Sequence, residues 1–141
     1  MSKFSAFMAG NVVKLENKKI VVSKRFKDEN GKPIEWEIRA ITTDENDEIM
    51  RKSMVNVPIV GQRGAVTREL DQIKYKAALL AESVVYPDLN DAELQDSYGV
   101  KTPEALIKKM LYPSEENFLL SVVSDYSDIE ILDDKVEEAK N

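Results

Sequence analysis

Two stretches near the N-terminus have the alternating pattern of strands with one buried face. Residues 34–40 alternate strictly between apolar and polar side chains, and residues 20–26 place Ile20, Val22, Lys24 and Phe26 on one face. Between them, Asn30-Gly31 supplies the positive φ that a tight reversal needs. The pattern predicts an antiparallel β-hairpin. Its apolar face, which includes Trp36, needs a cover because an isolated hairpin is only marginally stable in water.

Beyond residue 43 the apolar residues mostly recur at the three- and four-residue spacing of helices. Thr43 is predicted to cap a helix that starts at Asp44, and a long helix is predicted to run from Thr67 to Pro87. The apolar stripe of that long helix consists of Leu70, Ile73, Ala77, Leu80, Ala81 and Val84. Three shorter helices are predicted to follow, starting at Asn90-Asp91, Thr102 and Ser114. The expected fold class is α+β, with an N-terminal antiparallel β-hairpin packed on a mainly α-helical domain.

Two apolar segments lie outside these helical stripes. The first is a short amphipathic helix predicted at the N-terminus, with Gly10 as its stop and with Phe4, Phe7 and Met8 on one face. The second is a loop over 54–66, with a short strand inside it as the alternative, which loses the helical spacing and has as its apolar residues Met54, Val55, Val57, Ile59 and Val60. Termini and loops often carry binding residues, so both segments are candidate docking surfaces for a partner helix.

Composition narrows the chemistry that the chain can perform. Among 141 residues there is no histidine and no cysteine, which excludes Ser-His and Cys-His nucleophile pairs, thiolate or imidazole zinc sites and redox CxxC motifs. The acid-rich runs 44–48 and 88–93 lack the ligand spacing of a calcium loop, and we interpret them as helix starts. The GxxG pattern at 61–64 lacks the context of a KH domain. The sequence therefore predicts no catalytic residue, no metal site and no cofactor.

The net charge of −6 is unevenly distributed along the chain. Residues 1–33 carry eight basic and three acidic side chains, whereas residues 113–141 carry nine acidic and two basic ones. An acidic chain of this kind disfavours nucleic-acid binding. No apolar run approaches the length of roughly 20 residues that spans a bilayer, and no secretory signal pattern is present. We expect a single cytoplasmic domain over 1–141, with a mobile acidic tail from about residue 128.

Four stretches together resemble the XkdN-like tail assembly chaperones of tailed bacteriophages and prophages. They are VVSKRFKDENGKPIEWEIRAIT (21–42), KYKAALLAESVVYPDLNDAELQDSYGV (74–100), TPEALIKKMLYPSEENFLL (102–120) and VEEAKN (136–141). The resemblance implies a non-catalytic chaperone that binds the tape measure protein, keeps it soluble during tail tube assembly and is absent from the finished virion. It implies the tail tube protein as a second candidate partner. Self-association stays open, and the alternative function is a structural tail or head-tail component.

Overall fold

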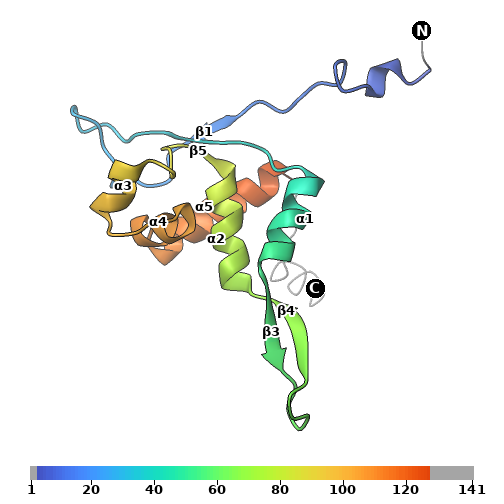
Figure 1. The fold of residues 1–141 in the computed structure, drawn as a ribbon. Coiled ribbons are helices and arrows are strands. Elements are labelled where there is room, and N and C mark those ends of the chain that lie inside the picture. The colour runs from blue at the N-terminus through green and yellow to red at the C-terminus, as the bar shows by residue number, and fades with distance from the viewer. Residues whose placement is uncertain (1–2, 128–141) are drawn as a thin grey trace, which may run out of the picture.

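The computed structural model describes residues 3–127, and Figure 1 shows how their helices and strands are arranged. The helices within this range are α1 (Thr43–Lys52), α2 (Gln72–Ser83), α3 (Ala92–Ser97), α4 (Pro103–Met110) and α5 (Pro113–Ser127), with a 3-10 turn, η1, at Ser5–Phe7. The strands are β1 (Lys18–Ile20), β2 (Trp36–Ile38), β3 (Met54–Pro58), β4 (Val66–Leu70) and β5 (Val84–Tyr86). The predicted α+β class is confirmed, while the predicted tail from about 128 lies outside the described residues.

The predicted N-terminal hairpin is present as β1 and β2. The strands pair antiparallel, with Ile20 opposite Trp36, and the chain reverses through a turn in which Gly31 has a φ of 78°. Their ladder is shorter than predicted, because residues 21–26 are not in a strand, and the next pairing is an isolated bridge between Lys27 and Pro33. On the other side of β2, β5 adds a third antiparallel strand, so the order is β1-β2-β5.

Helix α2 is the centre of the helical layer, and it packs against α1, α4 and α5. Trp36 and Ile38 of β2 are buried in the same apolar cluster as Leu79 and Leu80 of α2, so the helices supply the cover that the hairpin needs. The other buried apolar residues of this cluster are Val22, Ile41, Ile49, Tyr75, Ala77, Val84, Leu89, Leu106, Ile107, Met110, Leu111, Leu119, Leu120 and Val123.

The predicted long helix is wrong at both ends. Residues 66–70 form strand β4, and α2 begins only at Gln72, where the Asp71 carboxylate accepts a hydrogen bond from the Lys74 N–H. At the other end, Val84 belongs to β5. Both strand segments contain β-branched residues, which favour strands. Because β4 pairs with β3 and β5 pairs with β2, these residues are extended despite their weak helical spacing.

Other predicted boundaries shift by a residue or shrink. Thr42 rather than Thr43 caps α1, through a capping box with Glu45. Helix α5 starts at Pro113, so Ser114 lies inside it and does not cap it. The predicted starts of α3 and α4 are confirmed, with Asp91 and Thr102 as the caps. The predicted N-terminal helix is only the three-residue turn η1.

Candidate interaction surfaces

Residues 54–70 form an antiparallel hairpin, here called the arm, that projects from the helical body (Figure 1). Within the segment 54–66 that was predicted as a loop, the short strand is present as Met54–Pro58, and what the prediction missed is its pairing with Val66–Leu70. Two glycines with positive φ, Gly61 and Gly64, flank the tip at which the chain reverses. At the base, the Asp71 N–H donates to the Ser53 carbonyl over 2.9 Å and joins the arm to α2.

The register divides the predicted contact residues of the arm between its two faces. Val55, Val57 and Ile59 lie on one face, where all three are half-buried. Met54 lies on the other face opposite Leu70, whose side chain packs against the core. Val60 is at the tip and is 98% exposed. The arm thus brings together Val55, Val57 and Ile59 and separates them from Met54 and Val60.

The N-terminal candidates lie far from the arm, on a segment that extends away from the body (Figure 1). Phe4, Phe7 and Met8 are all exposed, and Phe7 reaches 80%. The two phenylalanine rings lie 6.4 Å apart between centroids, so the structure brings Phe4 and Phe7 together, although on a short turn and not on the predicted helix. Asn11 stabilises the turn by donating from Nδ2 to the Ser5 carbonyl. Whether either surface binds a partner stays a prediction.

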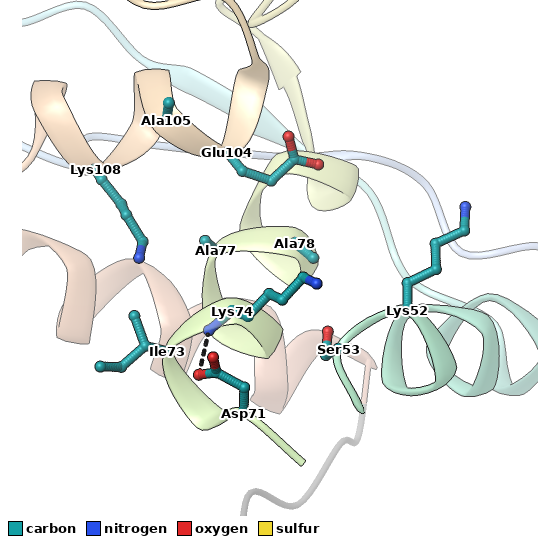
Figure 2. A pocket seen from close by; sticks show the side chains of 10 residues that line it. All are labelled: Lys52, Ser53, Asp71, Ile73, Lys74, Ala77, Ala78, Glu104, Ala105 and Lys108. Carbon is teal, nitrogen blue, oxygen red and sulfur yellow. Dashed lines mark hydrogen bonds between the residues drawn. The ribbon is translucent and has the colours of Figure 1, made fainter. Parts of the chain in front are cut away.

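A groove that the sequence did not predict lies between the end of α1, the start of α2 and α4, and it is shown in Figure 2. Its volume is about 680 Å³. Ala77, Ala78 and Ala105 contribute small side chains, and Ile73 stands beside them with 67% exposure. The remaining lining residues are polar or charged, namely Lys52, Ser53, Asp71, Lys74, Glu104 and Lys108. The only sequence feature that marks this groove is Ile73, an apolar residue that the helical spacing placed in the apolar stripe of the predicted long helix and that the structure leaves exposed.

The strongest electrostatic contacts join segments of the body and do not form a reactive site. Arg39 binds both Glu45 and Glu82, and its hydrogen bonds are the main cause that lowers the pKa of Glu45 to about 2. Arg25 binds Glu115 in the same way, and the pKa of Glu115 also falls to about 2. Both carboxylates are therefore held ionised by guanidinium groups, which suits a structural clamp and does not suit a proton donor.

Two kinds of feature are absent from the part of the chain that the structure describes. Among residues 3–127, no three acidic side chains gather closely enough to hold a metal ion. No helix in that range is both long and apolar enough to cross a membrane. The candidate binding surfaces that the structure does show are the N-terminal segment, the arm and the groove.

Comparison with known proteins gives one consistent family. Residues 4–140 match the family described as phage XkdN-like tail assembly chaperone protein. The chain is 32% identical over 139 residues to the phage-like element PBSX protein XkdN of Bacillus subtilis, a match that covers 97% of this chain and 93% of that protein. It is also 32% identical over 139 residues to the uncharacterised protein YqbN of the same organism, covering 97% of this chain and 92% of that one.

A solved structure supports the same fold. The crystal structure of the protein YqbN superimposes on this chain with a TM-score of 0.74 and 26% sequence identity. The superposition covers 92% of this chain and 99% of the other, so the similarity spans nearly the whole of both molecules.

Proposed function

The chain belongs to the phage XkdN-like tail assembly chaperone family, and we propose that it binds the tape measure protein and keeps it soluble while the tail tube assembles. The observation that carries the proposal is the family match over residues 4–140. In this proposal the protein is not an enzyme, uses no cofactor, acts in the cytoplasm of the host cell and leaves before the virion is complete.

The shape of the molecule supports a holding function. A chaperone of this kind must expose apolar groups to a partner while it remains soluble itself. The N-terminal segment and the arm meet the first need, because both project from the body and carry exposed or half-buried apolar side chains. The net charge of −6 meets the second.

Co-expression with the tape measure protein from the same gene cluster tests the proposal. We expect the tape measure protein to be soluble and to copurify with this chain, and to precipitate when it is produced alone. A tape measure protein that is equally soluble alone and forms no complex would contradict the proposal. The same assay with the tail tube protein tests the second candidate partner, and sedimentation of the purified chain tests self-association.

The two candidate surfaces are separable by mutation. Replacing Phe4 and Phe7 with serine removes two exposed rings that take no part in the core, so the fold should be unchanged. Replacing Val57 and Ile59 with threonine keeps β-branched side chains in or beside β3 but reduces the apolar face of the arm. The pair of changes that weakens the complex identifies the contact surface. If neither weakens it, both surfaces are excluded as main contacts.

Mass spectrometry of purified virions separates the alternative, a structural tail or head-tail component. A chaperone should be absent from mature particles or present only in traces. Copies at the stoichiometry of the known tail proteins would show that the chain is a building block of the particle.

A further inference from the structure

The arm has two strand edges, and the hydrogen-bond pattern distinguishes them. The Ile59 N–H donates to the Ala65 carbonyl over 3.1 Å, and the Asp71 N–H donates to Ser53 over 2.9 Å. In an antiparallel ladder with this register, the odd-numbered residues of the arm bond across to the facing strand. The even-numbered residues must therefore turn their backbone N–H and C=O groups outward, away from the arm.

The outward edge of β4 is complete, whereas that of β3 is interrupted. Val66, Arg68 and Leu70 each carry an outward N–H and C=O. On β3, Pro58 occupies an outward position and has no N–H, which is where an edge strand tolerates proline. Within residues 3–127, no hydrogen bond is formed by the outward backbone groups of Val66 or Arg68.

Charge further distinguishes the β4 edge. The arm carries two arginines and one glutamate, in a chain whose overall net charge is −6. Arg68 is exposed near the middle of the edge, and Arg63 is exposed at the tip. Among the residues that the structure describes, neither guanidinium lies in an ion pair, although Arg25, Arg39 and Arg51 all do. An extended segment that pairs with β4 would therefore meet an available positive charge.

We propose that the outward edge of β4, from Val66 to Leu70, binds an extended acidic segment of the tape measure protein as an added strand. This inference rests on the proposed function. The added strand places its alternate side chains on the two faces of the arm. Its acidic residues lie beside Arg68, and its apolar residues extend the face formed by Val55, Val57 and Ile59.

A second copy of this chain is a poorer occupant of the same edge. A symmetric antiparallel pairing of two β4 strands centred on Arg68 would set the two Arg68 side chains opposite each other. Like charges in directly opposed positions are destabilising. The charge of the edge thus favours an acidic partner over self-pairing.

Matched proline substitutions test the edge, because Asn56 and Arg68 are register partners on opposite strands. Arg68→Pro removes an outward N–H from β4, and Asn56→Pro removes the equivalent N–H from β3. Arg68→Ala and Asn56→Ala are the controls, because each removes the same side chain as the proline variant but keeps the backbone N–H. Relative to its alanine control, we expect Arg68→Pro to weaken the complex with the tape measure protein by about fivefold, the effect of one lost hydrogen bond of average strength. Asn56→Pro should leave the affinity at the level of Asn56→Ala.

Circular dichroism and thermal unfolding of each variant show whether the arm and body stay folded. If Arg68→Pro disturbs the fold, Arg68→Glu is the second test, since it retains the N–H and should weaken binding most strongly at low salt. Equal binding by the wild type, Arg68→Pro and Arg68→Glu would overturn the strand-addition proposal and leave the proposed function intact. Absence of binding by the wild type would instead overturn the proposed function.

Two further results would show that something other than the tape measure protein binds at this edge. If Arg68→Ala makes the chain associate with itself and leaves tape measure binding unchanged, Arg68 only guards the edge against self-pairing. If the Arg68 amide is already protected from hydrogen exchange in the isolated monomer, the chain itself occupies the edge. Either result overturns the assignment of this edge to the tape measure protein.

Discussion

Arg25 joins two parts of the chain that lie 90 residues apart in sequence. Its Nε donates to Glu115 Oε2 over 2.9 Å, and its Nη2 donates to the Met110 carbonyl over 2.8 Å. The guanidinium also lies 4.6 Å from the centre of the Tyr112 ring. These contacts fix the residues that follow β1 against the start of α5. No local pattern indicates such a pair, because neither residue differs in type or spacing from the other surface charges around it.

The Arg25–Glu115 pair predicts an acid-dependent loss of stability. Hydrogen bonds from Arg25 lower the pKa of Glu115 from its ordinary value near 4.5 to about 2 in the folded protein. A carboxyl with a lowered pKa stabilises the fold above its unfolded pKa, and the contribution disappears as the pH falls from about 4.5 to 2. Glu115→Gln should therefore cost about 1 kcal/mol at pH 7, after allowing for solvent screening of the pair.

Urea unfolding of wild type and Glu115→Gln between pH 2 and 7 measures this effect. The two stability curves should converge toward pH 2, where Glu115 is half protonated even in the folded protein. Glu48→Gln is the control, since Glu48 pairs with Arg51 and Lys52 on an exposed face of α1 and should change stability little. A constant difference at all pH values would show that the Glu115 charge is not the cause.

Two aliphatic residues on α2 allow a matched test of packing. Leu79 is fully buried in the core, whereas Ile73 is 67% exposed in the groove. Leu79→Ala should lower the free energy of unfolding by about 3 kcal/mol, because it removes buried methyl groups and leaves a cavity. Ile73→Ala should change it by less than about 0.5 kcal/mol. Similar losses from both variants, measured by urea unfolding, would show that Ile73 is covered in solution.

At the scale of elements, the helices and strands that could be predicted from the sequence are those whose conformation is set by neighbouring residues in the chain. The β1–β2 hairpin was predictable because Asn30-Gly31 and the alternation after Ile34 are local signals. The caps Asp91 and Thr102 were predictable for the same reason. The arm was not, because residues 66–70 have a mixed pattern that becomes a strand only when paired with β3. The candidate residues of the arm are exposed or half-buried, but their division between two faces could be read only from the register.

The isolation of the arm predicts that it opens more easily than the body. A two-stranded hairpin is marginally stable alone, and the arm meets the core chiefly at its base, through Leu70. Hydrogen exchange followed by NMR should show the amides of Val57 and Thr67, which bond across the arm, exchanging much faster than those of Leu79 and Leu80 in α2. Equal protection of both sets would mean that the arm unfolds only with the whole molecule.

At the scale of the whole molecule, one apolar cluster contains residues from Val22 to Val123. Strand β2 supplies Trp36 and Ile38, α2 supplies its buried face, and the later helices close the core. The fold class followed from the sequence because hairpin and helices have different periods. The pairing of β5 with β2 could not be predicted from the sequence. Val84 follows α2 without a break, and it becomes part of a strand only by pairing with β2, which lies almost 50 residues earlier.

A single shared cluster predicts that the body unfolds in one step. Trp36 is the only tryptophan in the chain, it is 2% exposed, and it lies on β2, whereas the far-UV circular dichroism signal comes mainly from the helices. Because Trp36 packs in the same cluster as α2, α4 and α5, loss of the sheet and loss of the helices should coincide. Urea transitions followed by Trp36 fluorescence and by circular dichroism should therefore have the same midpoint and slope. A fluorescence transition that precedes the helical one would show that the hairpin and β5 detach first, and that the chain does not behave as the single domain expected from its sequence.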